Sequence, residues 1–224
     1  MILRPYQEQM VSKAVAALKK HGDTLAVAPT GAGKTVLLSA LAGRVGGKQL
    51  ILQHRDELTF QNAKKYREVN PRVRVGMFNA DIKDWKGDAT FAMVQTLCRD
   101  RALSTIPKLD LLVIDEAHHA VAPSYRKVVD AVRDKNPDCR IFGVTATPAR
   151  GDGKGLRHIF SNCCDQLSLH SLIAMGFLVR PRTFVCTLEG TDDRLASLRK
   201  TASGEFDMNE AEAVLDMEVH NAAV

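Results

Sequence analysis

The sequence predicts an α/β fold in which a mostly parallel sheet is covered by helices on both faces. Short apolar runs alternate along the chain with segments of helical periodicity, and short loops join them. Three of the apolar runs are followed at once by polar residues that can carry chemistry. Alternation of this kind is typical of parallel sheets with helical crossovers, for which right-handed connections are the default.

The first half of the chain is predicted from apolar spacing and from residues that end helices. The expected elements are, in order, a helix over 4–18, a strand over 25–28, a helix over 34–45, a strand over 49–53, a helix over 54–69 and a strand over 73–78. Pro5 suits a first helical turn, and Gly46 with Gly47 ends the second helix. Residues 79–88 are polar and predict a loop, in which Trp85 is expected to pack rather than to stack on a base.

The second half of the chain continues the same alternation. The expected elements are a strand over 89–94, a short helix from 95, a strand over 109–114, a helix over 124–136, a strand over 140–144, a helix over 167–175 and a last strand over 183–186. The acidic segment over 187–224 has apolar residues at helical spacing and ends without a stop signal. We therefore expect it to be helical and to belong to a longer protein.

Composition and charge limit the class of protein. A chain of 224 residues, of which 45% are hydrophobic, can bury a sizeable core and suits one large α/β domain or one domain with part of another. Residues 1–186 hold 28 basic and 17 acidic residues, whereas residues 187–224 hold three and nine. We expect one domain over 1–186 whose basic character favours a polyanionic partner, with ordinary solvated charge as the alternative.

The sequence argues against a membrane or secreted protein. No apolar run approaches membrane-spanning length, and the N-terminus lacks the charged and then apolar pattern of a signal peptide. The five cysteines include no C-x-x-C pair, and we interpret them as reduced thiols of a cytoplasmic protein. A metal site through Cys163 and Cys164 is the weaker alternative, because the usual ligand spacings are absent.

The stretch over 24–35, Thr-Leu-Ala-Val-Ala-Pro-Thr-Gly-Ala-Gly-Lys-Thr, has the strand–loop–helix pattern of a phosphate-binding loop. Gly31 and Gly33 lack the Cβ atoms that would keep backbone N–H groups away from phosphate oxygens, and the helix that follows adds its positive N-terminal end. Lys34 can reach the β- and γ-phosphates, and the Thr35 hydroxyl can bind Mg²⁺. A loop that merely contains two glycines and a lysine is the alternative.

Two further groups of polar residues follow predicted strands, at the edge of a parallel sheet where ligands bind. Asp115 and Glu116 come directly after an aliphatic strand, which suits a Mg²⁺ ion held by Asp115 and a water molecule oriented and deprotonated by Glu116. His118 can sense the γ-phosphate or contact a partner domain. Thr145 and Thr147 form the other group. An acidic pair on a solvated loop is the alternative for the two carboxylates.

Taken together, these motifs resemble those of the superfamily 2 helicases and translocases. Six motifs occur in that family's order and as a set they are specific to it: Leu3-Arg-Pro-Tyr-Gln7, Ala28–Thr35, His54-Arg-Asp-Glu-Leu58, Val94-Gln-Thr-Leu97, Asp115-Glu-Ala-His118 and Thr145-Ala-Thr-Pro148. The family accepts Ala28 where the phosphate-loop consensus has glycine. The resemblance implies that residues 1–186 form a RecA-like, P-loop ATP-binding domain that uses ATP and Mg²⁺.

The resemblance also assigns roles around the nucleotide. It implies that ATP is bound by residues of the first two motifs, namely Arg4, Gln7, Thr30, Gly31, Ala32, Gly33, Lys34 and Thr35. Within this set it places Gln7 on the adenine. It implies that Glu116 is the catalytic base, that Lys34 and Asp115 also take part in catalysis, and that the metal ion binds Thr35 and Asp115.

The other motifs are implied to bind nucleic acid or to couple that binding to ATP. The positions that match contacts to the nucleic-acid backbone are Arg55, Gln95 and Thr96. The positions that match coupling residues are His118, Thr145 and Thr147. Without the family pattern, we would interpret Arg55 as a surface arginine at the start of a helix and Thr96 as a helix N-cap.

The particular residues found in two of the motifs favour DNA over RNA as the nucleic acid that is bound. The segments Thr145-Ala-Thr-Pro-Ala-Arg-Gly-Asp152 and Asp115-Glu-Ala-His118 are more similar to RadD-type repair helicases, XPB-like motors and restriction-enzyme motor subunits than to DEAD-box RNA helicases. We therefore expect the motor domain of a DNA helicase or translocase that contacts the phosphate backbone. The alternatives are an RNA helicase, a nucleotide-dependent nucleic-acid binding module without motor activity, and a small-molecule kinase.

The motifs of the family's second RecA-like domain, including its arginine finger, have no match in the sequence. We expect residues 187–224 to lead into that domain. Because the finger neutralises charge in the transition state, the lone first domain is expected to bind ATP and Mg²⁺ weakly and to turn ATP over poorly.

Overall fold

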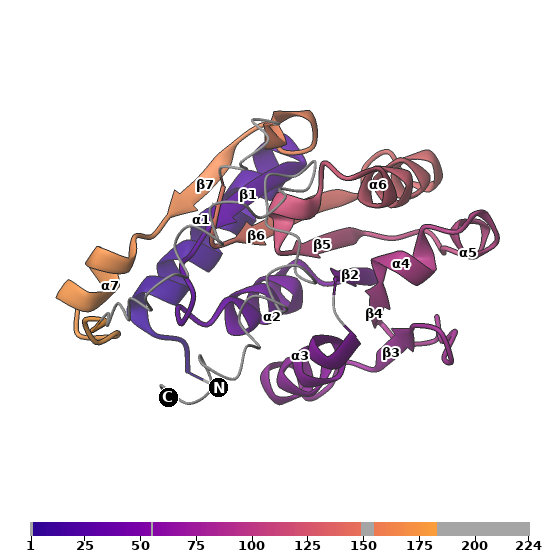
Figure 1. Cartoon of the computed structure of the whole chain (residues 1–224). Coiled ribbons are helices and arrows are strands. Elements are labelled where there is room, and N and C mark those ends of the chain that lie inside the picture. Colours follow the sequence, from indigo (N-terminus) through magenta and orange to yellow (C-terminus); the bar gives the residue numbers. More distant parts are fainter. Residues whose placement is uncertain (1, 55, 149–154, 183–224) are drawn as a thin grey trace, which may run out of the picture. The chain divides into compact units, whose positions relative to one another are not determined.

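One parallel sheet forms the centre of the fold. A computed structural model describes residues 2–54, 56–148 and 155–182, with residues 56–58 described by their backbone alone. Within that part, strands pair in the order β3-β4-β2-β5-β6-β1-β7, and every neighbouring pair is parallel (Figure 1). The strands are β1 (Asp23–Val27), β2 (Gln49–Gln53), β3 (Val75–Phe78), β4 (Ala89–Met93), β5 (Leu111–Asp115), β6 (Arg140–Thr145) and β7 (Cys163–Gln166).

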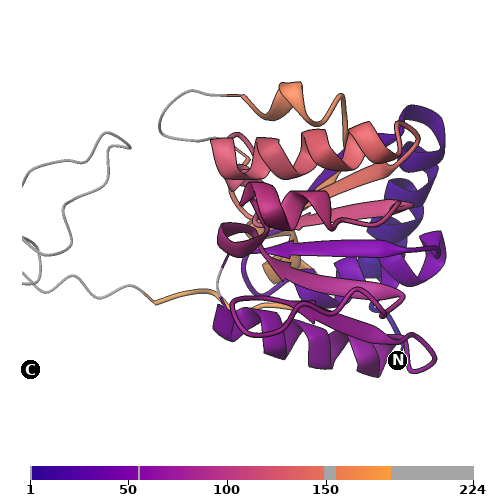
Figure 2. The same ribbon diagram turned by 90° about the vertical axis from the view of Figure 1, so that its right-hand side faces the viewer.

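Helices cover both faces of this sheet (Figure 2). They are α1 (Pro5–His21), α2 (Lys34–Val45), α3 (Asp56–Val69), α4 (Val94–Leu97), α5 (Asp100–Ser104), α6 (Pro123–Lys135) and α7 (Leu169–Ala174), with short 3₁₀ turns η1 (Ala117–His119) and η2 (Leu156–His158). Side chains alternate between the faces, so Leu111 and Val113 of β5 pack in one core with α1, α2 and α3. Leu112 and Ile114 pack in a second core with α4 and α6.

The predicted fold class is confirmed, and most predicted elements lie within a few residues of their expected bounds. Helix α2 and strand β2 have the predicted bounds, whereas the helix expected from residue 54 begins at Asp56. The helix expected over 167–175 is shorter, because the Ser168 hydroxyl accepts a hydrogen bond from the backbone N–H of Ser171 at 3.0 Å and caps it.

One strand and one α-helix were not predicted, nor were the two 3₁₀ turns, and one predicted strand cannot be compared. Strand β7 lies at the edge of the sheet with exposed or half-buried side chains, so it lacks the apolar alternation that reveals a strand. Helix α5 has only five residues, none of them buried. The strand expected over 183–186 and the acidic segment over 187–224 lie outside the described residues.

The described cysteines, Cys98, Cys139, Cys163 and Cys164, are all free thiols. Cys163 and Cys164 begin strand β7, and in the described ranges no group of three or more His, Cys, Asp or Glu side chains is placed to hold a metal ion. Over those same ranges, no helix combines the length and the apolar character needed to cross a membrane.

The carboxyl ends of the central strands meet at one edge of the sheet, and the predicted motifs follow them. Strand β1 runs into the phosphate loop, β5 ends at Asp115 and β6 ends at Thr145. The register places Val27 beside Thr145 and Asp115 beside Val144. The backbone N–H of Ala28 donates to the carbonyl of Thr145 at 2.9 Å. The parallel topology thus brings three distant segments of the chain together.

Candidate functional site

The predicted phosphate-binding loop turns tightly between β1 and α2. Gly31 and Gly33 have φ angles of 84° and 76°, in the left-handed region that favours glycine. A Cβ atom on Gly33 would lie 2.7 Å from the side-chain nitrogen of Gln7, so a larger residue would have to displace Gln7. The backbone N–H groups of Lys34 and Thr35 open helix α2, where they have no partner within the helix and can bind an anion.

The start of α1 holds this loop in place. The Gln7 side chain is buried, and its amide nitrogen donates to the carbonyl of Ala32 at 3.2 Å. The Tyr6 hydroxyl donates to the same carbonyl at 3.0 Å, and the Arg4 backbone N–H donates to the Gln7 amide oxygen at 3.0 Å. Gln7 therefore positions the loop, while its contact with adenine stays a prediction. Thr30, at the tip of the loop, is exposed.

We expect Gly33→Ala to cost more stability than Gly22→Ala and to weaken ATP binding. Both glycines have a left-handed φ, which costs a residue with a Cβ about 1–2 kcal/mol. Around Gly22 nothing lies within 4 Å of an added Cβ, whereas at Gly33 the added atom meets Gln7. Urea unfolding and ATP titration of the two variants separate backbone strain from loop displacement. Equal losses of stability together with unchanged ATP affinity would contradict this role of Gly33.

The segment that follows α7 also lies against the loop, which was not predicted. The Phe177 ring packs edge-on against Tyr6 with ring centroids 4.9 Å apart, and the Arg4 guanidinium carbon lies 5.3 Å from the centre of the Phe177 ring. The Leu178 side chain comes within 3.0 Å of the place where a Cβ on Gly31 would be. An apolar run directly after a helix-ending glycine is the sequence signal that was available.

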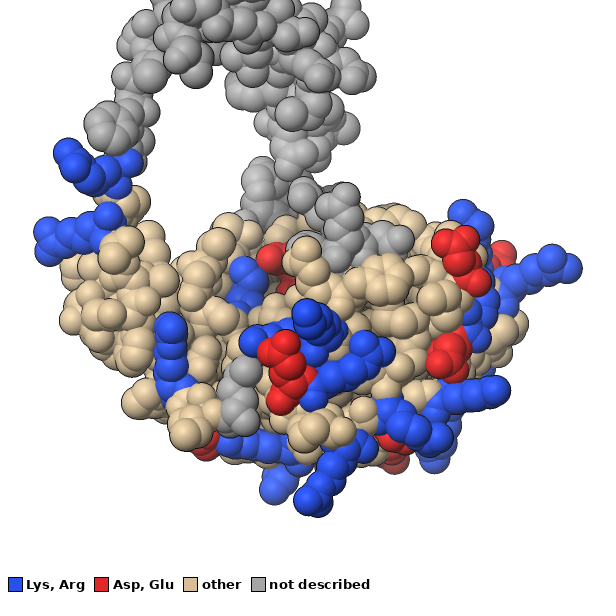
Figure 3. Space-filling model, turned by 90° about the horizontal axis from the view of Figure 1, so that it is seen from below, with Lys and Arg blue, Asp and Glu red and all other residues tan. Residues whose placement is uncertain are grey.

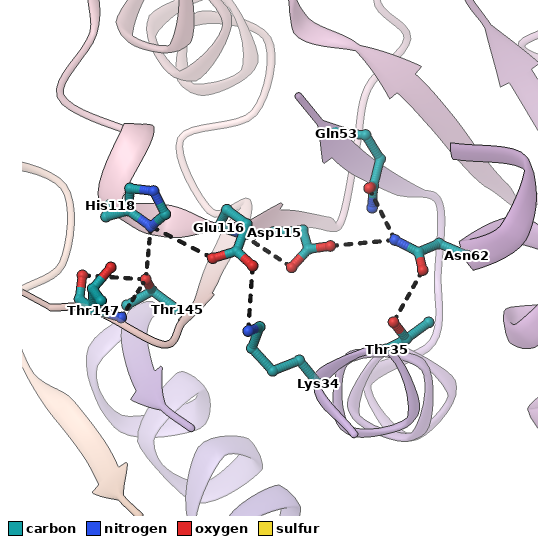
Figure 4. A network of polar contacts seen from close by, with 9 residues as sticks. All are labelled: Lys34, Thr35, Gln53, Asn62, Asp115, Glu116, His118, Thr145 and Thr147. Atoms are coloured by element: carbon teal, nitrogen blue, oxygen red, sulfur yellow. Dashed lines mark hydrogen bonds and ion pairs between the residues drawn. The ribbon is translucent and has the colours of Figure 1, made fainter. Parts of the chain in front are cut away.

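Glu116 lies at the centre of a network of polar contacts (Figure 4). Its φ of 49° is the one positive value among the described residues other than glycine, a strained conformation that is typical of functional sites. The Lys34 ammonium lies 3.2 Å from one carboxylate oxygen of Glu116, and Nδ1 of His118 lies 3.5 Å from the other. The same His118 nitrogen lies 2.9 Å from the Thr145 hydroxyl. The network joins the phosphate loop to the ends of β5 and β6.

The predicted coupling residues lie in one chain of contacts that starts at this carboxylate. The backbone N–H of Thr147 donates to the Thr145 hydroxyl oxygen at 3.2 Å, and the Thr145 hydroxyl lies 3.3 Å from the carbonyl of Thr147. Since Thr145 also contacts His118, the segment after β6 is tied to Glu116 through two side chains. A change at the carboxylate can therefore reach that segment by direct contact.

Asp115 and Thr35, the two predicted metal ligands, are bridged by one amide. The Thr35 hydroxyl donates to the Asn62 side-chain oxygen at 3.0 Å, and the Asn62 side-chain nitrogen donates to an Asp115 carboxylate oxygen at 3.3 Å (Figure 4). Burial, together with the neighbouring charge of Glu116, raises the pKa of Asp115 to about 6. The raised pKa indicates that the negative charge of Asp115 is only partly compensated, and a bound cation would stabilise it. Both ligands present the oxygen atoms that Mg²⁺ prefers. The residues therefore fit a magnesium ion.

Asn62 and Gln53 belong to this site although neither was predicted. Asn62 is buried on the inner face of α3, and its side-chain nitrogen also donates to the Gln53 side-chain oxygen at 3.0 Å. Gln53 ends β2 at the same edge of the sheet. An amide on the inner face of a helix, where an apolar residue is the rule, was the signal in the sequence.

Of the predicted nucleic-acid residues, the structure describes Gln95 and Thr96, whereas Arg55 lies outside the described residues. The Gln95 side-chain nitrogen donates to the backbone carbonyl of His54 at 2.9 Å. The His54 ring stacks on His119 with centroids 4.5 Å apart, and the His119 ring lies 4.1 Å from that of His118. Two rings thus connect Gln95 with the coupling residue His118, and His119 was given no role by the sequence. Thr96 lines a surface cavity.

Positive charge alone does not outline an interface on the face that α3 covers. Figure 3 shows Lys and Arg side chains spread over that side of the molecule, with Asp and Glu among them. Several of these cations are paired, as in the contacts of Arg44 with Glu8 at 2.6 Å and of Lys65 with Glu68 at 2.7 Å. Exposed pairs of this kind contribute little to stability but neutralise part of the basic surface.

The chain is similar to several known helicase proteins. The family described as "Type III restriction enzyme, res subunit" matches residues 1–150. IRC3 of Saccharomyces cerevisiae, which is named as an ATP-dependent helicase, is 33% identical over 172 residues, covering 69% of this chain and 25% of that protein. Rad25 of Haloarcula marismortui, which is named as a DNA 3′-5′ helicase, is 31% identical over 156 residues, covering 66% of this chain and 23% of that protein.

A solved structure shows the same architecture. The crystal structure of the Pyrococcus furiosus Hef helicase domain matches with a TM-score of 0.55 and 26% identity, covering 66% of this chain and 34% of that chain. The chain spans about a quarter of the length of the two curated relatives, at 25% and 23%.

Proposed function

The chain belongs to the family described as the res subunit of type III restriction enzymes and carries the first RecA-like domain of a superfamily 2 helicase, and on that premise we propose that it is the ATP-binding half of a DNA helicase or translocase. The observation that carries the proposal is the meeting of Lys34, Asp115 and Glu116 at one edge of the sheet. We propose that residues 1–186 form this domain and that residues 187–224 lead into a second RecA-like domain, which completes the ATP site.

In this proposal the triphosphate binds at the N-terminal end of α2 and to Lys34. Phosphate oxygens compete for the ammonium that now pairs with Glu116 at 3.2 Å, and Glu116 is then free to orient and deprotonate the attacking water. Thr35 and Asp115 would hold Mg²⁺, and the bound ion would neutralise phosphate charge. His118 lies beside the freed carboxylate and passes the change on to Thr145.

We propose that the nucleic acid binds near Gln95 and Thr96 through its phosphate backbone. The ring contacts from His54 through His119 to His118 support a route from this region to the ATP site. The motif spelling and the name of the Haloarcula relative support DNA as the polymer. A cytoplasmic location belongs to the same proposal and is supported by the free thiols of the four described cysteines.

The test is ATP turnover by the 224-residue chain alone and with single-stranded DNA, duplex DNA or RNA. We expect slow turnover that DNA raises more than RNA does. The slow rate follows because an arginine finger is worth about 10³–10⁵ in rate in related phosphoryl-transfer enzymes. Glu116→Gln provides the blank.

Three other results of this turnover experiment would change the proposed function. Equal or stronger stimulation by RNA would replace DNA with RNA in the proposal. Fast, nucleic-acid-stimulated turnover would contradict the need for a second domain. Nucleotide-dependent binding of nucleic acid, with no turnover that Glu116→Gln removes, would support a binding module without motor activity.

A further inference from the structure

A cavity of about 370 Å³ opens beyond the carboxyl ends of β3 and β4. The residues that line it include Phe78, Lys83, Trp85, Thr96, Arg99 and Arg101. It is separate from the Lys34–Glu116 network. Its volume falls in the range of ligand sites in proteins, which start at about 300 Å³.

Two aromatic rings form the wall of this cavity. Trp85 and Phe78 pack with ring centroids 4.9 Å apart, and the Trp85 ring nitrogen donates to the Thr105 hydroxyl at 3.1 Å. The loop that carries Trp85 is folded back on the sheet, since the backbone N–H of Asp84 donates to the carbonyl of Met77 at 2.8 Å. The wall is therefore held in place before any ligand arrives. Trp85 therefore packs against Phe78 and also lines the cavity.

The rim of the cavity is positively charged. The residues that line it include three cations, Lys83, Arg99 and Arg101, and no Asp or Glu. The Lys83 ammonium lies 4.9 Å from the centre of the Phe78 ring. Arg99 and Arg101 are exposed, and neither side chain has an ion-pair partner among the described residues.

The acidic residue between the two arginines in the sequence contacts a different cation. Asp100 stands between them in the sequence, but its carboxylate lies 3.8 Å from the Lys127 ammonium. Two guanidinium groups without an ion-pair partner in the described part of the chain, beside an aromatic wall, match a ligand that carries both phosphate and a flat apolar group. Guanidinium groups bind phosphate in a fork geometry, and aromatic rings accept bases of any kind by stacking.

We propose that this cavity binds one nucleotide of a nucleic-acid strand, with the phosphate at Arg99 and Arg101 and the base or sugar against Trp85. The proposal rests on the proposed function, because Thr96 belongs both to the cavity and to the residues expected to contact the nucleic-acid backbone. It extends the proposed nucleic-acid surface from Thr96 to the end of β3, where the sequence motifs predict no role for Trp85, Arg99 or Arg101.

Trp85 provides a direct readout, because it is the only tryptophan in the sequence. The experiment titrates the chain with a dye-labelled single-stranded DNA and follows the anisotropy of the dye and the fluorescence of Trp85 together. We expect Trp85 fluorescence to fall with the same midpoint as the anisotropy rises. A titration with heparin is the control for polyanions that have no base.

Charge removal gives the second measurement. In Arg99→Ala/Arg101→Ala we expect weaker binding and a salt dependence of log affinity that is less steep by roughly 1 to 2, because two phosphate contacts are lost. The matched control is Arg67→Ala/Arg72→Ala, which removes the same charge from exposed positions at the other end of β3. Both variants change exposed side chains, and circular dichroism checks that they fold.

The outcomes separate this proposal from the proposed function. DNA binding with unchanged Trp85 fluorescence, and with equal effects of the two double variants, would overturn the cavity as a nucleotide site and leave the proposed function standing. Quenching by heparin equal to that by DNA would also overturn it, because the cavity would then accept any polyanion. Failure of the unmodified chain to bind DNA or RNA at all would overturn both.

Discussion

In Glu116→Gln, ATP turnover is expected to fall by about 10²–10⁴-fold, the usual contribution of a general base, while ATP binding is kept or becomes tighter. The two effects have one cause. In the structure the Glu116 carboxylate lies 3.2 Å from the Lys34 ammonium, so the phosphates must compete with it for that charge. Glutamine removes both the base and the competitor. Single-turnover hydrolysis of labelled ATP at high protein concentration measures the first effect, and equilibrium titration with a fluorescent ATP analogue measures the second.

Glu68→Gln is the matched control. Glu68 pairs with Lys65 at 2.7 Å on the surface of α3, so the control makes the same chemical change and breaks a comparable ion pair away from the site. It is expected to leave turnover and ATP affinity unchanged. If Glu116→Gln weakened ATP binding as strongly as it slowed turnover, Glu116 would act in holding the nucleotide, and its role as base would have to be given up.

The phosphate loop and the strand that ends at Asp115 could be predicted from the sequence, because each depends on a short stretch of neighbouring residues. Gly33 and Lys34 follow an apolar strand within a few residues, and Asp115 ends another, so strand, loop and carboxylate could be predicted from short stretches. The parallel topology then requires that these ends meet at one edge. The helix over 34–45 and the strand over 49–53 were predicted to the residue because a glycine pair ends one and polar residues flank the other.

What the sequence did not predict depends on distant contacts. Asn62 contacts the predicted metal ligand Asp115 only because α3 packs with that face toward the ends of β2 and β5. Phe177 reaches Tyr6 from the far end of the domain. Strand β7 pairs with β1 at the sheet edge without a hydrophobic pattern of its own. In each case the residue type is ordinary, and its role depends on a partner that is distant in the sequence. Asn62 and Asp115, for example, are 53 positions apart.

The second large effect is expected for Asn62→Leu, which keeps the size of the side chain and removes its three hydrogen bonds to Thr35, Asp115 and Gln53. Groups that orient metal ligands are worth about 10–100-fold in metal affinity, and we expect a loss of that size. Binding of Mn²⁺, as a spectroscopic substitute for Mg²⁺, measures it in the presence of ADP without any need for turnover. Asp115 keeps the hydrogen bond from the backbone N–H of Glu116 at 3.0 Å, but losing the Asn62 donor to its buried carboxylate is also expected to cost about 1–3 kcal/mol of stability.

Asn70→Leu separates orientation of the metal ligands from general loosening. The Asn70 side-chain nitrogen donates to the carbonyl of Ser39 at 2.9 Å, so this amide also ties the end of α3 to α2, away from the metal ligands. Its loss is expected to lower stability and to leave Mn²⁺ affinity unchanged. Equal losses of Mn²⁺ affinity in both variants would show that Asn62 acts only by packing α3 against the sheet.

Asn62 also connects the two proposed metal ligands with α3, a helix that begins in a motif predicted to contact nucleic acid. Helix α3 begins at Asp56, inside the motif His54–Leu58, of which the family resemblance assigns Arg55 to the nucleic-acid backbone. A strand bound at the start of α3 can shift the helix, and the amide of Asn62 passes that shift to Thr35 and Asp115. DNA is then expected to change the Mn²⁺ affinity of the unmodified chain and of Asn70→Leu but not that of Asn62→Leu. If all three respond alike, the coupling runs elsewhere, and the ring contacts from His54 to His118 become the route to test.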